Sequence, residues 1–147
     1  MTADMEIRLD ALDAQDFAMF RRQCGLPPLE PILLRRAIDG SLFTLLALCA
    51  EPGGDFEPAG MLRVVGDGAF VFIIYDVMVV PAHRNAGIGS ELIRTAISRV
   101  RAFFPPGRWL TVNLFAGPGR DEFYTRLGFY TLPNSGFGPG MQVIVKS

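Results

Sequence analysis

The chain has 147 residues, half of them hydrophobic and 20% charged, and its formal net charge at pH 7 is −1. This length fits a single domain over residues 1–147 with one core. The balanced charge argues against a nucleic-acid binder or a polybasic membrane patch, and the longest apolar runs, residues 42–50 and 69–75, are too short to cross a bilayer.

The first half of the chain predicts a strand, two helices and three more strands. Alternation at residues 7–9 predicts the first strand, and Asp13 is a candidate N-cap for a helix that runs to Cys24. A second helix over residues 30–39 is predicted to end at Gly40 in the C′ position. Three strands follow over residues 41–50, 59–65 and 69–80, the last two joined by the turn sequence Gly66-Asp67-Gly68, which permits positive φ.

The second half contains the clearest amphipathic helix. Apolar residues recur at helical spacing up to residue 104, where the sequence Pro105-Pro106-Gly107 ends the pattern. A strand over residues 109–116, a short helix through Leu127 with Gly128 at C′, and two last strands over residues 129–132 and 141–145 complete the prediction. The order β-α-α-β-β-β-α-β-α-β-β predicts an α/β domain with a mixed sheet.

The N-terminus and the cysteines indicate a compartment. The first ten residues contain neither an apolar run nor a charged leader, so they do not resemble a signal peptide. Cys24 and Cys49 are the only cysteines, and no cluster of His accompanies them. We predict two buried free thiols, no metal site and a reducing cytoplasm.

The segment from Asp76 to Ser90 joins the strongest strand to the strongest helix through a loop with two nearby glycines. Unpaired N–H groups and a partial positive charge make a helix N-terminus favourable for a phosphate, and glycine lets the backbone approach the anion. The loop lacks the lysine of a P-loop and the spacing of a dinucleotide fingerprint. We therefore predict a phosphate-bearing ligand at Arg84, Asn85, Ala86, Gly87, Ile88, Gly89 and Ser90.

Two motifs in this order resemble the GNAT superfamily of acetyltransferases. One is Arg-x-x-Gly-x-Gly at residues 84–89, after a strand that ends in Val-x-Val-x-Pro; the other is Phe-Tyr-Thr-Arg-Leu-Gly-Phe at residues 123–129. The resemblance implies a GNAT-like fold, with a mostly antiparallel central sheet flanked by helices. It implies transfer of an acetyl group from acetyl-coenzyme A to the primary amine of a small molecule by direct attack, with coenzyme A as product.

The resemblance also implies how the cofactor binds. The loop amides would hold the pyrophosphate, and the backbone of Val77, Met78 and Val79 would bind the pantetheine and the thioester. One departure is at Gly117 and Arg120, where the family often has Asn-x-x-Ala, so the cofactor contact of that Asn is absent or replaced. Residues 63–68, Asp76 and residues 138–141 further resemble a bacterial subgroup similar to plant-type serotonin N-acetyltransferases.

Catalytic roles follow from the same resemblance. Tyr124 would protonate the leaving thiolate, because a phenol pKa near 10 is roughly matched to a thiol; the alternative is a packed aromatic. The backbone N–H of Val77 would stabilise the oxyanion. Arg84 would pair with a phosphate or cap the loop. Phe123 and Arg126 would lie near the cofactor, although Arg126 is equally an exposed, solvated side chain.

The general base stays open. Strict alternation places Tyr75 and Val77 on one strand face, with Ile73, and Asp76 and Met78 on the other, with Ile74. The resemblance places the substrate on the Val77 face, where Tyr75 is the only polar group. Asp76 would then face the other side, as a structural carboxylate or, in the alternative, as the general base. The amine could also lose its proton through a water relay at Tyr75 or arrive neutral. His83, the only histidine, is interpreted as an exposed or phosphate-side residue.

Two other functions are consistent with the motifs. A non-catalytic acyl-CoA-binding sensor or scaffold would keep residues 84–90 and dispense with Tyr124. An acetyltransferase for protein or peptide amines would use the same machinery on another acceptor. We expect no nucleic-acid or membrane partner, and the resemblance allows a homodimer.

Overall fold

The computed structural model describes residues 4–147; residues 1–3, with which the predicted domain begins, lie outside the described residues. It contains two compact units, one up to Leu114 and one from Phe115 to Ser147, which are described separately below. Among residues 4–147, every helix is too short or too polar to span a bilayer.

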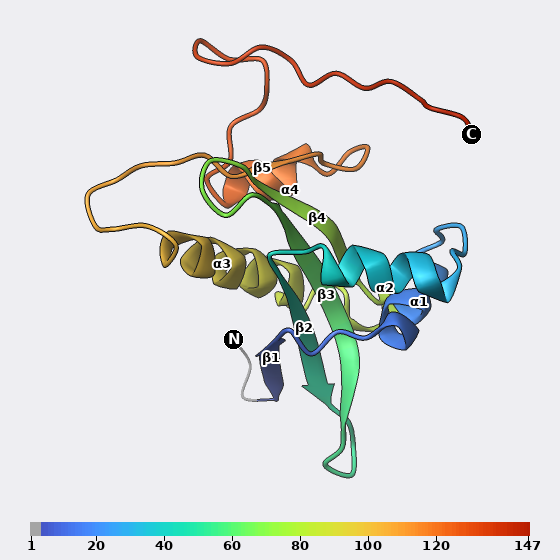
Figure 1. Ribbon diagram of the computed structural model, residues 1–147. Helices are drawn as coiled ribbons and strands as arrows, with labels where there is room; N and C mark the ends of the chain where they lie inside the picture. Colours follow the sequence, from blue (N-terminus) through green and yellow to red (C-terminus); the bar gives the residue numbers. More distant parts are fainter. Residues whose placement is uncertain (1–3) are drawn as a thin grey trace. The chain divides into compact units, whose positions relative to one another are not determined.

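The first unit is built on a five-stranded sheet whose spatial order follows the sequence (Figure 1). The first four strands are antiparallel neighbours, and the fifth runs parallel to the fourth. The strands are β1 (Met5–Leu9), β2 (Phe43–Ala50), β3 (Phe56–Gly66), β4 (Phe72–Val79) and β5 (Asn113–Leu114). The helices are α1 (Ala14–Gln23), α2 (Pro31–Asp39), α3 (Ile88–Arg101) and, in the second unit, α4 (Asp121–Arg126), with a 3₁₀ helix η1 (Pro81–His83) after β4.

Helices cover both faces of this sheet, α1 and α2 on one side and α3 on the other (Figure 1). Asp13 caps α1 as predicted, since its carboxylate accepts a hydrogen bond from the Asp16 N–H at 2.7 Å. The core between α1, α2 and the sheet contains Phe17, Phe20, Leu34, Met61 and Met78, among others. The opposite core forms where α3 lays Ile88, Leu92, Ile93, Ala96 and Val100 on the strands.

The β3–β4 turn has the predicted positive φ values, 142° at Gly66 and 76° at Gly68. A Cβ atom on Gly66 would lie 1.8 Å from the carbonyl oxygen of Val71, so this position accepts only glycine. The Asp67 carboxylate accepts hydrogen bonds from the backbone N–H groups of Ala69, Phe70 and Val71, each at 2.8 Å. These bonds to the ionised form lower the pKa of Asp67.

The fold class and the order of the elements agree with the prediction as far as α4, and the two strands predicted after α4 are absent. No strand forms over residues 129–132 or 141–145, both predicted as strands. A strand needs a neighbouring backbone to pair with, and the side chains of Met141, Val143, Ile144 and Val145 are between 82% and 90% exposed. The predicted strand over residues 109–116 is reduced to β5.

Two smaller expectations also need correction. Gly40 ends α2 with a φ of −81°, so it is a right-handed C-cap and not a left-handed C′ residue. Gly128, by contrast, follows α4 with a φ of 96°, as predicted. Both cysteines are free, but they are half-buried and not buried, because Cys24 caps the end of α1 and Cys49 lies near the end of β2.

Candidate active site

Strand β4 bulges in its middle. Tyr75 pairs with Arg63 and Met78 pairs with Met61, so two residues, Asp76 and Val77, stand opposite the single residue between those partners. The ladder pairs neither Asp76 nor Val77 with a residue of β3. Asp76 has a φ of 55°, a left-handed conformation that costs a non-glycine residue about 1–3 kcal/mol and is held in place by surrounding contacts.

The bulge overturns the predicted alternation of faces. Met61, and with it Met78, belongs to the core under α1 and α2. Ile74 pairs with Val64, which shares the α3 side of β3 with Gly60. Ile74 and Met78 therefore lie on opposite faces, although strict alternation had placed them together. An extra residue in one strand shifts the register by one and reverses every later side chain.

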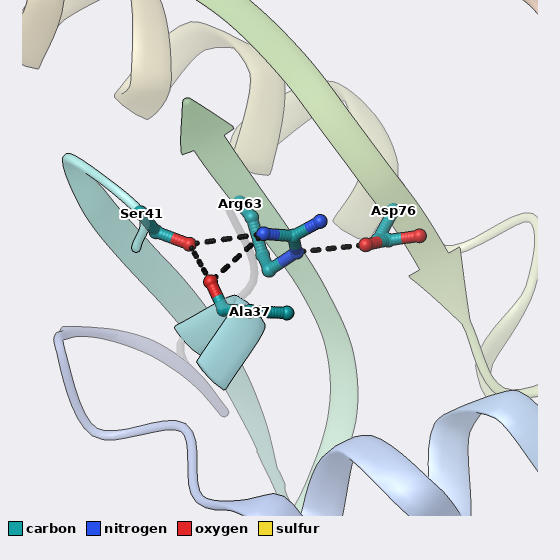
Figure 2. A network of polar contacts seen from close by, with 4 residues as sticks. All are labelled: Ala37, Ser41, Arg63 and Asp76. Atoms are coloured by element: carbon teal, nitrogen blue, oxygen red, sulfur yellow. Dashed lines mark hydrogen bonds and ion pairs between the residues drawn. The ribbon is translucent and has the colours of Figure 1, made fainter. Parts of the chain in front are cut away.

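Asp76 is engaged by Arg63, its neighbour on β3 (Figure 2). The Arg63 Nε donates to the Asp76 carboxylate at 2.7 Å, and only 13% and 18% of these two side chains are exposed. The Nη1 of Arg63 donates to the carbonyl oxygen of Ala37 at 3.0 Å and to the Ser41 Oγ at 3.1 Å. The guanidinium also lies over the ring of Phe17, 5.7 Å from its centroid. Asp76 is thus tied to α1 and α2 through one arginine.

The loop after β4 leads into α3 as a left-handed turn. Asn85 and Gly87 have φ values of 63° and 83°, and Gly87 is the N-cap of α3, which no side chain caps. A Cβ atom on Gly87 would meet nothing within 4 Å. No capping side chain therefore occupies the N–H groups of the first turn, those of Ile88, Gly89 and Ser90. Such N–H groups can bind an anion. The Ile88 side chain is buried, so this residue offers its backbone alone.

Arg84 turns back toward the end of β4. Its Nε donates to the carbonyl oxygen of Val79 at 3.1 Å, and its Nη2 lies 3.8 Å from the Cys24 Sγ. The Cys24 thiol itself lies 3.6 Å from the same carbonyl oxygen. Of the two roles predicted for Arg84, these contacts correspond to capping of the loop. Contact of this exposed side chain with a phosphate stays a prediction.

The His83 side chain is half-buried. Of the two interpretations from the sequence, an exposed residue or a phosphate-side residue, the first is therefore wrong. The Nε2 of His83 lies 3.1 Å from Oε1 of Glu57, at the start of β3, and 3.6 Å from Oε1 of Glu51, in the connection between β2 and β3. The hydrogen bond with His83 lowers the pKa of Glu57, and the hydrogen bond with Glu57 raises that of Glu51. Within residues 4–147, these three side chains form the single grouping of at least three His, Cys, Asp or Glu side chains close enough to bind a metal ion.

Tyr124 lies in the second unit, on α4. Its ring packs edge-on against Phe123, at 5.0 Å between centroids, and against Phe129, at 5.8 Å. Burial raises the pKa of the Tyr124 phenol, and the positive charge of Arg120 partly opposes that effect. Tyr124 therefore stays protonated at neutral pH. Arg126 forms an exposed ion pair with Glu122, one helical turn away, at 2.7 Å.

The predicted site residues thus fall into two groups. Tyr75 and residues 77–79 and 84–90 lie in the first unit on β4, its following loop and the start of α3; Phe123, Tyr124 and Arg126 lie in the second. The sequence prediction missed the partnership of Arg63 with Asp76. Its signal was a lone charge within the apolar run Met61-Leu62-Arg63-Val64-Val65, since a buried charge requires a partner.

Comparisons with known proteins agree on one family. A family model described as an acetyltransferase (GNAT) domain matches residues 47–131. Serotonin N-acetyltransferase 2, chloroplastic, of Oryza sativa subsp. japonica is 29% identical over 112 residues, which are 76% of this chain and 53% of that protein. A histone acetyltransferase of Glycine max is 36% identical over 78 residues, 50% of this chain and 30% of that protein.

A solved structure extends the likeness of fold to nearly the whole chain. The GNAT-family acetyltransferase of Streptococcus pneumoniae TIGR4 has a TM-score of 0.75 at 23% identity and covers 97% of this chain and 99% of its own. The matched part of the chain spans 53% of the length of the rice relative and 30% of the length of the soybean relative.

Proposed function

The chain belongs to the GNAT family of acetyltransferases, and from this premise we propose that it transfers an acetyl group from acetyl-coenzyme A directly to the primary amine of a small molecule. When bound, acetyl-coenzyme A supplies the activated acetyl group as a thioester. The observation that carries the proposal is the bulge of β4 at Asp76 and Val77, together with the N-terminus of α3, which follows β4 in the chain and has glycine, Gly87, as its N-cap.

The residues present fit this cofactor. Gly87 is left-handed, and the space where its Cβ would stand contains no atom within 4 Å. The backbone amides of residues 87–90 would hold the pyrophosphate, with support from the partial positive charge of the helix N-terminus. The backbone of Val77, Met78 and Val79 would hold the pantetheine. Arg84 would exchange its bond with the Val79 carbonyl oxygen for a phosphate oxygen.

Two groups of the chain would act on the reaction itself. The Val77 N–H would donate a hydrogen bond to the carbonyl oxygen as negative charge develops there, an effect of about 3 kcal/mol for one donor. Tyr124 would donate its phenolic proton to the departing sulfur. The raised pKa of Tyr124 suits this role, because a general acid must be protonated before it acts.

Asp76 fits poorly as the general base, because Arg63 already engages its carboxylate at 2.7 Å. An amine of pKa about 10 is protonated at neutral pH, and its deprotonation costs about 4 kcal/mol. We therefore propose that the amine arrives neutral or loses its proton to a water near Tyr75, whose side chain is 41% exposed.

The acceptor class is proposed from the relatives. Serotonin, which the rice relative acts on by its name, is an arylalkylamine, and small arylalkylamines are the first acceptors to test. The soybean relative is named for histone acetylation, so a protein lysine is the second. The two free thiols favour a reducing compartment such as the cytoplasm. We further propose that residues 1–147 form one domain and that two copies of the chain form a homodimer.

The decisive experiment combines binding with turnover. Acetyl-coenzyme A at 100 times its Kd should stabilise the protein by about 2.7 kcal/mol, seen as a rise in melting temperature that NAD and ATP do not reproduce. Release of free thiol is then followed with tryptamine, serotonin, spermidine and a lysine peptide. Binding without thiol release from any amine would favour the sensor or scaffold, release with the peptide alone would favour a protein acetyltransferase, and absence of binding would refute the proposed cofactor.

A further inference from the structure

The Arg63 side chain joins the bulge to both helices on its face of the sheet. Its Nε contacts Asp76 on β4, its Nη1 contacts Ala37 in the last turn of α2, and its guanidinium plane covers Phe17 of α1. Figure 2 shows the guanidinium between Asp76 on one side and Ala37 with Ser41 on the other. The contacts with Asp76, Ala37 and Phe17 are therefore made to three different elements, β4, α2 and α1.

An arginine is required for this arrangement. The planar guanidinium presents donors in fixed directions, so it can hold a carboxylate with one edge and a carbonyl oxygen with another while its face stacks on an aromatic ring. The carbonyl oxygen of Ala37 belongs to the C-terminal end of α2, where backbone acceptors lack helical partners and carry partial negative charge. A lysine would offer one point charge to Asp76 or to the helix end.

The position of Asp76 gives this contact a consequence for the backbone. The N–H of Val77 belongs to the peptide unit that follows Asp76, so the backbone dihedral angles of Asp76 set the direction in which that N–H points. Asp76 has a left-handed φ of 55°, a conformation that an aspartate rarely adopts without support. In this structure the Asp76 side chain forms the ion pair with Arg63.

We propose that Arg63 and Asp76 are positioning residues that fix the bulge of β4 and thereby aim the Val77 N–H at the reacting carbonyl oxygen. This inference rests on the proposed acetyl transfer. The pair touches neither substrate in the proposal; it acts through the backbone. Its loss should therefore lower kcat, because the oxyanion contact exists only as charge develops. Most of the affinity for coenzyme A should remain, because residues 87–90 would still hold the pyrophosphate.

Four variants test the pair. Arg63→Met removes the ion pair and keeps an apolar stem over Phe17; Asp76→Gly also removes it, but glycine adopts positive φ freely, so the bulge itself remains allowed. Both should lower kcat about tenfold or more, since a misaimed oxyanion donor loses part of its effect. The Kd for coenzyme A, measured by calorimetry, should stay close to that of the wild type. Arg63→Lys and Asp76→Asn should lie between wild type and these variants, because each keeps part of the contact.

The matched control is Arg94→Met, which breaks an exposed arginine–glutamate pair on α3 and should leave kcat unchanged. A second readout is independent of turnover: the chemical shift and hydrogen exchange of the Val77 amide by NMR, on 15N-labelled protein at a temperature where every variant is folded. Arg63→Met and Asp76→Gly should both speed this exchange. Arg63→Met, which leaves the sequence neighbours of Val77 unchanged, should also move the resonance, and Arg94→Met should do neither.

The outcomes separate the inference from the function on which it rests. Unchanged kcat and unchanged exchange of the Val77 amide in folded Arg63→Met and Asp76→Gly would overturn the inference and leave the proposed function intact. A wild-type protein that consumed no acetyl-coenzyme A would overturn the proposed function, and the Val77 amide would then decide whether the pair fixes the bulge. If Arg63→Met does not fold, Arg63→Lys and Asp76→Asn give the same two readouts.

Discussion

A Cβ atom on Gly60 of β3 would lie 2.9 Å from Cγ2 of Ile88, the first residue of α3. It would also lie 3.2 Å from the backbone carbonyl oxygen of Met78 on β4. The first turn of α3 therefore rests on the sheet at a point where only a hydrogen fits. Because we propose that this turn faces the pyrophosphate, a glycine outside the motif determines how closely the motif approaches β4.

Gly60→Ala should destabilise the protein by about 1–3 kcal/mol, the usual cost of overpacking a core. The Ile88 methyl group can move, but the Met78 carbonyl belongs to a paired strand and yields less. Urea denaturation followed by circular dichroism measures the change. Gly138→Ala is the control, because a Cβ atom there meets nothing within 4 Å. Equal urea midpoints for Gly60→Ala and the wild type would contradict the tight contact.

Gly87→Ala should weaken coenzyme A binding, because its Cβ would stand where the pyrophosphate approaches. A left-handed φ also strains any alanine, so a control with equal strain is needed. Gly107 has a φ of 84° against 83° for Gly87, and neither position has an atom within 4 Å of a new Cβ. Calorimetric titration should show loss of affinity in Gly87→Ala alone. Equal affinities in both variants would make Gly87 a purely structural residue.

Tyr124→Phe should lower kcat by ~10²-fold or more with little change in KM, because the hydroxyl acts only as the thiolate develops. The measurement is steady-state release of free thiol with the best amine. Tyr130→Phe removes the hydroxyl of a tyrosine that is 87% exposed in the same unit and is the matched control. An unchanged kcat in Tyr124→Phe, where chemistry limits the rate, would remove Tyr124 from the mechanism.

The pH dependence of kcat should carry the signature of the same phenol. Burial raises the pKa of Tyr124 above the ordinary tyrosine value of 10.0, so the protonated, donating form persists through the neutral and mildly alkaline range. The kcat of the wild type should decline only above pH 10, and this alkaline limb should be missing from the residual activity of Tyr124→Phe. A decline centred near pH 8 would assign the limb to another group.

Asp67→Asn should reduce the loss of stability in acid. The folded-state pKa of Asp67 lies below its ordinary value of 3.8, so its carboxylate stabilises the fold above that pH. The contribution disappears as pH falls through the folded value. Asparagine still accepts the turn's N–H bonds but carries no charge to lose. Urea midpoints at several pH values between neutral and acid should therefore fall less steeply in Asp67→Asn than in the wild type.

Features set by neighbours in the sequence could be predicted from the sequence. The Asp13 cap accepts from a residue three positions away, and the Gly66-Asp67-Gly68 turn depends on conformations that glycine alone adopts freely. The strand–loop–helix unit around Gly87 likewise carries its signal locally, in glycines at a helix start.

Features set by distant partners could not be predicted in the same way. The bulge at Asp76 is a shift in the register of β4 against β3, and the extra residue contacts Arg63, 13 positions earlier in the sequence. Alternation cannot show a shift that depends on another strand. Residues 141–145 are apolar and favour a strand by their composition, but no neighbouring strand pairs with them. Strand propensity without such a neighbour does not produce a strand.

The sequential order of the sheet has a kinetic consequence. β2, β3 and β4 are joined by connections of a few residues, 51–55 and 67–71, whereas β5 reaches β4 only after residues 80–112. Closing a short loop costs less entropy than closing a long one, and non-local pairings slow folding. We expect the β2–β3–β4 meander to form in the folding transition state and β5 to join afterwards. Destabilising substitutions within the meander should then slow folding, while those in β5 should mainly accelerate unfolding.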